Sequence, residues 1–289
     1  MPAPHSTGLP GLDAQHDFQR ARRRATISRL VARLRGDPDD VGVVLPYEEV
    51  IAALGFVSER RVGLTVVQLD AIVGSVDRSR DYDRRFRPTS GRTRGRWEQI
   101  AAAARRGESF PPIDVLKVGE LYFVRDGHHR VSVARALGRT DIDAYVTEVQ
   151  TRVDAEEAMR LADLPLKSHQ RVFFDRVPLP AEAHDEIELS EPMEWALLAE
   201  MVEAWGFRAM QSRGAALNRK QNALLWLETE FRPVVAMLHE AGLVGDKTNA
   251  EAYMRIAGER YWLLRTHEWT DDVLKQVIEG KGRWQHPPE

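Results

Sequence analysis

Residues 112–149 read PIDVLKVGELYFVRDGHHRVSVARALGRTDIDAYVTEV, and this stretch decides the fold of the region around it. Its first part predicts a β-hairpin. Residues 113–118 and 121–125 have the composition of paired strands, and the Gly-Glu pair between them suits a tight type II′ turn. The chain therefore leaves this part as a strand.

The apolar residues then change period. Val131, Ala134 and Leu137 recur at helical spacing, and residues 142–149 form a further apolar run that predicts a third strand. Between the hairpin and the helix lies the sequence DGHHR, residues 126–130. This motif is therefore expected between a strand and the first turn of a helix.

The position and the composition of the motif indicate an anion site. Free backbone N–H groups at a helix N-terminus attract anions, and Gly127 lets a ligand approach the main chain closely. Arg130 adds a planar fork of donors suited to phosphate. The imidazoles of His128 and His129 could bind phosphate, transfer protons or ligate a metal, and Asp126 could hold a divalent cation. A nucleotide or a phosphodiester fits this set best.

A plainer interpretation of the same residues is structural. Asp126 would then cap the helix, and His128 and His129 would be surface residues that happen to adjoin. Folding does not require two adjacent histidines, because Ala or Ser would extend or cap the helix as well. The functional interpretation is therefore the one we develop.

The residues that carry a family resemblance are YFVRDGHHR at positions 122–130 and VARALG at positions 133–138. Together they resemble the ParB/sulfiredoxin superfamily, which includes CTP-binding partition proteins, ATP-dependent sulfiredoxins, free-serine kinases and ParB-like nucleases. The resemblance covers roughly residues 64–149. It implies a small α/β (α+β) domain with a mixed sheet, in which a Gly-X-X-Arg loop binds nucleotide phosphates.

Residues 128–130 differ from the motifs of two sub-families, and these differences narrow the range of activities that the resemblance implies. Sulfiredoxins carry a catalytic cysteine directly after the glycine, where this chain has His128, and the chain contains no cysteine. Partition proteins place Glu-Arg-Arg there, whereas this chain has His128, His129 and Arg130. The His-His-Arg version is similar to the nuclease-labelled members and to the serine kinases.

Composition sets outer limits on the function. The chain has 289 residues, of which 43% are hydrophobic and 29% charged, as in an ordinary globular protein. A formal charge of −3 argues against a uniformly nucleic-acid-binding surface, so any such surface must be local. The absence of cysteine excludes disulfides and thiol catalysis, and no apolar run or secretory signal stands out, so we expect a cytoplasmic protein.

A second informative stretch, residues 74–96, is rich in arginine. Its arginines are interleaved with three aspartates and two aromatic residues, and such a set can contact phosphates and stack on bases. The residues are Arg78, Arg80, Arg84, Arg85, Arg87, Arg92, Arg94 and Arg96, with Asp77, Asp81, Asp83, Tyr82 and Phe86. The alternative is a loop held together by weak Asp–Arg pairs. We expect this stretch to share a ligand site with DGHHR.

The chain divides into five predicted segments. They are a disordered leader at residues 1–15, an N-terminal helical extension at residues 16–63, the ParB/sulfiredoxin-like domain at residues 64–150, a connector at residues 151–188 and an all-helical C-terminal domain at residues 189–280. In the extension, residues 16–35 predict a basic amphipathic helix that contacts nucleic acid or an acidic partner, or else is solvated. Its apolar face consists of Ile27, Leu30, Val31 and Leu34.

The later segments carry less information about function. We predict a helix at residues 155–161, a short strand at residues 171–174 and a kink or break at Pro233 in a helix over residues 221–238. Further helices are expected at residues 249–264 and 270–278. Residues 231–253 resemble a helical domain of unknown function. The tryptophans of this half are expected to be core residues.

The leading hypothesis is phosphoryl chemistry, either nuclease-like phosphodiester cleavage or nucleotide-dependent phosphotransfer. Catalysis is assigned to His129, His128 and Asp126, and a divalent metal, Mg²⁺ or Mn²⁺, to Asp126 and Asp77. The predicted phosphate- or nucleotide-binding residues are Gly127, His129, Arg130, Ser132, Arg78 and Arg80. The expected partners are nucleic acid or a nucleotide such as ATP, ADP or CTP, with no membrane and a possible homodimer. The rival hypothesis is a non-catalytic DNA-binding protein or nucleotide switch, related to partition proteins.

Overall fold

The computed structural model describes residues 7–38, 40, 42–156 and 158–264, and side chains as far as residue 260. The chain forms two compact units, Met1–Arg171 and Val172–Glu289, which are described separately below. Within the described residues, no helix has the length and hydropathy of a membrane span.

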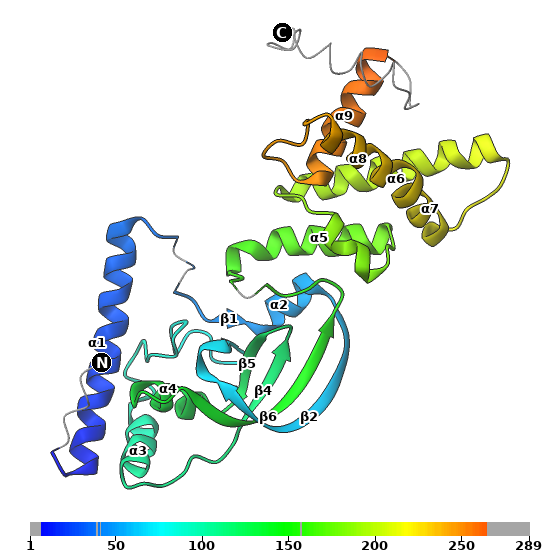
Figure 1. Cartoon of the computed structure of the whole chain (residues 1–289). Coiled ribbons are helices and arrows are strands. Elements are labelled where there is room, and N and C mark those ends of the chain that lie inside the picture. The colour runs from blue at the N-terminus through cyan, green and yellow to red at the C-terminus, as the bar shows by residue number, and fades with distance from the viewer. Residues whose placement is uncertain (1–6, 39, 41, 157, 265–289) are drawn as a thin grey trace. The chain divides into compact units, whose positions relative to one another are not determined.

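The first unit contains a six-stranded mixed sheet and its covering helices (Figure 1). The strand order is β1-β3-β5-β4-β6-β2, with β1–β3, β3–β5 and β4–β6 parallel and the other neighbours antiparallel. The elements are α1 (Pro10–Arg35), β1 (Leu45–Pro46), α2 (Tyr47–Leu54), β2 (Phe56–Gln68), η1 (Leu69–Ala71), β3 (Ile72–Ser75), α3 (Arg94–Arg105), β4 (Ile113–Val118), β5 (Leu121–Asp126), α4 (His128–Ala136), β6 (Asp141–Thr151) and η2 (Leu161–Asp163). The predicted mixed-sheet α/β class is confirmed.

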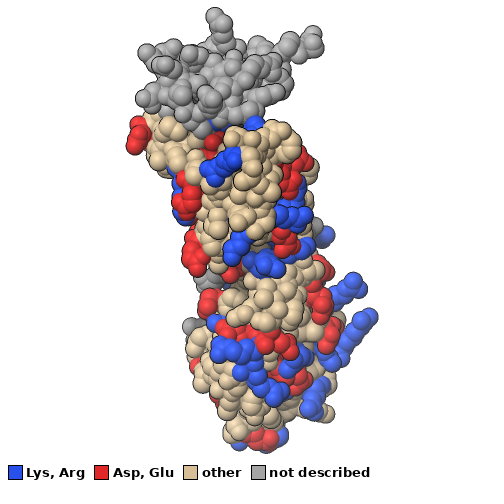
Figure 2. Space-filling view, turned by 90° about the vertical axis from the view of Figure 1, so that its right-hand side faces the viewer, with Lys and Arg blue, Asp and Glu red and all other residues tan. Residues whose placement is uncertain are grey.

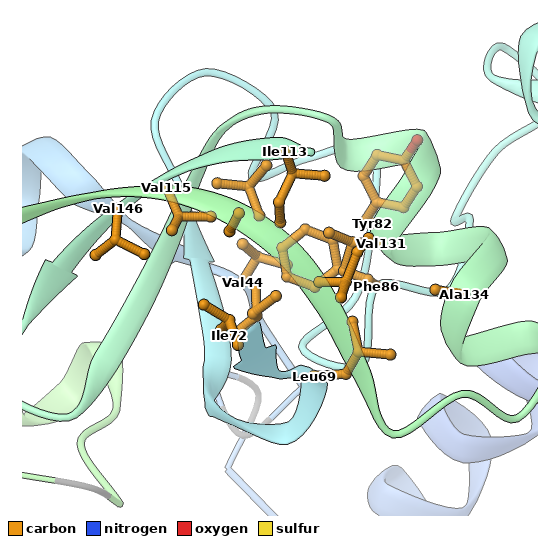
Figure 3. Close-up of a cluster of buried hydrophobic side chains, with 14 residues drawn as sticks. Val44, Leu69, Ile72, Tyr82, Phe86, Ile113, Val115, Val131, Ala134 and Val146 are labelled. Atoms are coloured by element: carbon orange, nitrogen blue, oxygen red, sulfur yellow. The ribbon is translucent and has the colours of Figure 1, made fainter. Parts of the chain in front are cut away.

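The main core lies between the sheet and α4. Val131 and Ala134, the helical-period residues of the sequence, face the sheet and are fully buried. Tyr82 and Phe86, which come from the arginine-rich stretch, pack into the same cluster (Figure 3). The aromatic residues of that stretch are therefore core residues that fasten its loop to the sheet, and they are not free to stack on bases.

A smaller core joins α1 to α3 and α4, which lie together in Figure 1. Phe18 of α1 packs edge-to-face on Trp97 of α3, with ring centroids 5.4 Å apart. The helix begins at Pro10, because proline is well suited to the first helical turn, so the predicted leader ends earlier than residue 15. Residues 1–6 lie outside the described part.

The face of α1 that packs differs from the predicted one. Ala14, Phe18, Ala21 and Ala25 are buried, whereas the apolar stripe of Ile27, Leu30, Val31 and Leu34 is exposed. The helix is longer than the body it packs on, so its C-terminal half continues past α3 and α4 (Figure 1). Periodicity identified the stripe correctly but could not reveal that the described part of this unit leaves these four side chains exposed.

Two predictions around the connector are wrong. The described residues of 155–161 form no helix apart from the start of η2, and the predicted strand at 171–174 belongs to α5 (Leu164–Arg176). Pro165 stands in the first turn of α5, where the missing N–H costs nothing, so it starts this helix and does not mark an extended segment.

The second unit is helical, as predicted. Its elements are the end of α5, η3 (Ala181–Glu186), α6 (Pro192–Arg213), α7 (Arg219–Trp226), η4 (Leu227–Phe231), α8 (Arg232–Glu240) and α9 (Asn249–Leu264). The break expected at Pro233 is a π-helical turn, η4, placed directly before the proline. Trp195 and Trp226 are buried core residues. Residues 270–278, for which a helix is predicted, lie outside the described part.

The packing of α1 gives a stability prediction. Phe18→Ala should lower the free energy of unfolding of the first unit by about 3 kcal/mol, because it empties a fully packed site against Trp97. Leu34→Ala is the matched control on the same helix, and it should change this free energy by less than about 0.5 kcal/mol because Leu34 is 80% exposed. Urea denaturation measures both. Equal effects would mean that α1 does not dock through Phe18.

Candidate functional site

The sheet topology brings two distant parts of the sequence together at the motif. β3 runs parallel to β5, with Ser75 opposite Val124, so both strands end at the same edge of the sheet. DGHHR follows β5 at that edge, and the arginine-rich stretch follows β3. The parallel pairing of β3 and β5 therefore brings the arginine-rich stretch close to DGHHR.

Gly127 is required by the backbone at the start of α4. It is the N-cap, with φ of +105°, a conformation that side-chain-bearing residues rarely adopt. A Cβ at this position would also collide with Ile113 of β4. As a glycine, the N-cap residue has no side chain that could accept hydrogen bonds from the N–H groups of the first helical turn.

His128 is buried and held by a serine. The Ser75 hydroxyl accepts the backbone N–H of Arg78 at 2.8 Å and lies 2.8 Å from His128 Nε2. Of the two described partners of this hydroxyl, the ring nitrogen is the one that can accept its buried O–H, so the O–H donates to Nε2 and the proton of the neutral ring is assigned to Nδ1. Burial, assisted by the nearby Arg78 cation, lowers the pKa of His128 to about 4. His128 is therefore a neutral residue at physiological pH.

His129 is half-buried and held by a tyrosine. Its Nδ1 lies 2.9 Å from the hydroxyl of Tyr82, and burial raises the pKa of Tyr82, so the phenol keeps its proton. Burial, followed by the charges of Arg78 and Arg96, lowers the pKa of His129. The phenol and Nδ1 share one hydrogen bond, in which the phenol donates when the ring proton is on Nε2. Tyr82 thereby fixes the orientation of the His129 ring.

Two arginines of the second stretch act on the motif. Arg78 lowers the pKa of both histidines, and Arg96 lowers that of His129. Both side chains belong to exposed residues. Arg80 is exposed as well, and its carbonyl accepts the hydroxyl of Thr89 at 3.0 Å. Arg78 and Arg80 are the two arginines predicted to bind phosphate, and of these Arg78 is the one that lowers the pKa of the histidines.

Arg130 and Ser132 make contacts within the protein. The Arg130 guanidinium, 16% exposed, donates to the carbonyls of Pro111 and Pro112 and to the carboxylate of Asp126. It thereby ties the first turn of α4 to the chain that enters β4. The Ser132 hydroxyl is buried and accepts the indole N–H of Trp97 at 2.8 Å. These bonds leave the Nε–H and one further N–H of Arg130, and the O–H of Ser132, for a phosphate contact.

Two carboxylates near the motif, those of Asp126 and Asp77, are the predicted metal ligands. Asp126 and Asp77 are exposed, and both counteract the lowering of the pKa of His128. Among the described residues, no three His, Asp or Glu side chains gather closely enough to hold a metal ion. Mg²⁺ is commonly held by one or two carboxylates together with substrate phosphates, and these two aspartates fit only that arrangement.

Comparisons with known proteins agree with the resemblance seen in the residues. Residues 75–161 match the family model described as the ParB N-terminal domain, which agrees with the predicted resemblance over that stretch and supports a role connected with nucleotides or nucleic acids in general. A crystal structure of sulfiredoxin from Arabidopsis thaliana is similar to this chain at 20% identity, covering 30% of this chain and 86% of that one, with a TM-score of 0.23. No curated protein matches the chain.

The depressed pKa of His128 predicts a pH-dependent stability. The folded state resists protonation of this ring down to about pH 4, whereas the unfolded chain protonates it near pH 6.5. The unfolded state therefore binds more protons in this window, and stability present above pH 6.5 is lost as the pH falls. We expect a loss of about 3 kcal/mol between pH 7 and pH 4. His128→Gln should remove that part of the pH dependence in urea denaturation, and an unchanged profile would contradict the assignment.

Proposed function

We propose, starting from the ParB N-terminal domain of residues 75–161, that this protein carries out phosphoryl chemistry on a nucleotide or nucleic-acid phosphate at the DGHHR motif. The reaction class is phosphodiester cleavage or phosphotransfer. In either case the oxygen of a water or hydroxyl group loses its proton and forms a bond to phosphorus while the bond to the leaving oxygen breaks, and in phosphodiester cleavage the departing alkoxide takes up a proton.

The phosphate is proposed to bind at the N-terminus of α4. The first-turn N–H groups, uncapped at Gly127, and the helix dipole supply partial positive charge. Arg78 and Arg96 supply full charges beside His129. Arg130 supports this site by fixing the helix against residues 111 and 112.

His129 is proposed as the proton-transferring group. In the free protein its pKa is lowered by burial and by Arg78 and Arg96. A bound phosphate offsets those charges and raises this pKa again, so the ring takes up a proton as the ligand arrives. The resulting imidazolium donates from Nδ1 to the Tyr82 oxygen and from Nε2 to the leaving oxygen. Tyr82 is a positioning residue in this scheme.

A divalent ion, Mg²⁺ or Mn²⁺, completes the proposal. Asp77 and Asp126 would hold it together with the substrate phosphate, and it would neutralise charge that develops on the phosphate oxygens. Asp126 already bonds Arg130 through one oxygen. ATP, ADP and CTP are the nucleotides to test first.

One observation carries the proposal: two adjacent histidines have different surroundings. His128 is sealed in by Ser75, Tyr82 and Phe86, whereas His129 is half-exposed among cations. A packing role explains the first histidine. It does not explain a second, half-exposed histidine whose pKa is lowered by burial and by two exposed arginines.

The test is turnover by the purified full chain with Mg²⁺ or Mn²⁺, on DNA, RNA, ATP, ADP and CTP. His129→Ala should lower turnover by roughly 10²–10⁴-fold and retain much of the ligand affinity. His169→Ala, which removes a half-buried histidine far from the motif in sequence, is the control and should leave turnover unchanged. Equal melting temperatures establish that the variants are folded. Absence of turnover on every substrate, with His129→Ala altering affinity alone, would refute the enzyme.

A non-catalytic nucleotide switch or DNA-binding protein is the second candidate. The exposed arginines of residues 78–96 favour it, because phosphate contacts need cations and no catalyst. On the face that Figure 2 shows, basic and acidic side chains are intermixed. In this case ligand binding would depend on Arg78 and no substrate would be turned over.

A further inference from the structure

The C-terminal half of α1 presents apolar side chains that the first unit leaves uncovered. Ile27 is 51% exposed, Leu30 58% and Val31 36%. They recur at i, i+3 and i+4, so they lie along one side of the helix. Single exposed apolar residues are normal, but an aligned set of large ones marks an interaction surface.

These side chains line a groove. Its volume is about 890 Å³, and its two sides are residues 26–35 of α1 and the loop at residues 83–87. The loop is tied to the helix, because Arg87 donates to the hydroxyl of Ser28 at 2.9 Å. Asp83 accepts from the Arg87 side chain at 2.7 Å and from the backbone N–H of Arg85 and Arg87, which fixes the loop itself. The groove is therefore preformed.

The charge on the groove is strongly positive. Six arginines line it, against two aspartates, an excess of four positive charges. The arginines are Arg29, Arg33, Arg35, Arg84, Arg85 and Arg87 and the aspartates are Asp37 and Asp83. The carboxylate of Asp83 is already used by Arg87. The chain as a whole has a net charge of −3, so this concentration of cations is local.

We propose that this groove binds an acidic amphipathic helix of a partner protein. Apolar side chains of such a helix, at i, i+3 or i+4 and i+7, would cover Ile27, Leu30 and Val31. Its carboxylates would meet the arginines on both sides of the groove, where each guanidinium can donate two parallel hydrogen bonds to one carboxylate. The site is separate from the DGHHR motif, so the proposal stands apart from the phosphoryl chemistry.

Charge and composition disfavour the other occupants. A second copy of α1 would bring Arg29, Arg33 and Arg35 against the same residues of its partner, and like charges at close range are unfavourable. Single-stranded nucleic acid is held by aromatic side chains on which bases stack. The described residues that line the groove include no aromatic residue, and its apolar part is aliphatic.

The experiment measures binding of a fluorescein-labelled 15-residue peptide to the full chain by anisotropy. The peptide carries Leu at i, i+4, i+7 and i+11 and mainly Glu elsewhere. Three further probes are the same peptide with Lys in place of Glu, a scrambled acidic peptide and a fluorescein-labelled oligothymidylate. Sedimentation velocity measures self-association in parallel.

A matched pair of double variants locates the binding surface. Leu30→Asp with Arg85→Glu alters the groove, whereas Leu34→Asp with Arg24→Glu makes the same changes on exposed residues that do not line it. We expect saturable binding of the acidic amphipathic peptide alone, weakened at least about tenfold by the first variant and unchanged by the second. Equal weakening by both variants, no saturable binding, preference for the oligothymidylate or the lysine peptide, or a dimer that competes with the peptide would each overturn the proposal.

Discussion

The buried hydrogen bond between Ser75 and His128 is the contact on which the arrangement of the motif depends. It joins the end of β3 to the first residue of α4, elements separated by more than fifty positions in the sequence. Because the serine oxygen also accepts the N–H of Arg78, the same contact sets the start of the arginine-rich loop. Loss of Ser75 would leave His128 Nε2 buried without this partner, and loss of His128 would leave the O–H of Ser75 without its acceptor, so each change is expected to be destabilising.

The consequences of this contact reach the second histidine. With His128 sealed beneath Tyr82 and Phe86, its neighbour His129 emerges from the core at the first turn of α4, where Tyr82 again supplies its partner. One buried tyrosine therefore packs against one imidazole and bonds the other. The division between a buried histidine and a half-exposed one follows from helix geometry, because consecutive residues of a helix point about 100° apart.

Local patterns in the sequence were sufficient for the hairpin, for α4 and for the position of DGHHR between them. The proximity of residues 78–96 to the motif could be suspected from composition, but its cause is the parallel β3–β5 pair, and short apolar runs do not reveal their partners. Ser75 was missed for the same reason. An isolated serine at the end of a short strand carries no signal until the topology places a histidine beside it.

Other differences have equally specific causes. In the sequence, Arg130 has the features of a phosphate ligand. In the structure its guanidinium donates to the carbonyls of Pro111 and Pro112. These prolines lie outside the helix of Arg130, so the helical pattern of the sequence does not predict the contact. The hydroxyl of Ser132 accepts a hydrogen bond from the indole N–H of Trp97. On α1, periodicity found an apolar stripe, but a stripe can be covered by its own chain or by a partner, and only the three-dimensional structure distinguishes these cases.

The central claim is that the adjacent histidines have separate roles, one structural and one facing the ligand. Histidine-selective NMR of the full chain, recorded against pH with and without Mg²⁺ and the bound nucleotide or oligonucleotide, tests it most directly. The account predicts that His128 stays neutral with its proton on Nδ1 down to about pH 4 whether or not ligand is present, while the pKa of His129 rises on binding. A ligand-dependent shift at His128, or a His129 resonance that does not respond to any ligand that binds, would contradict the account.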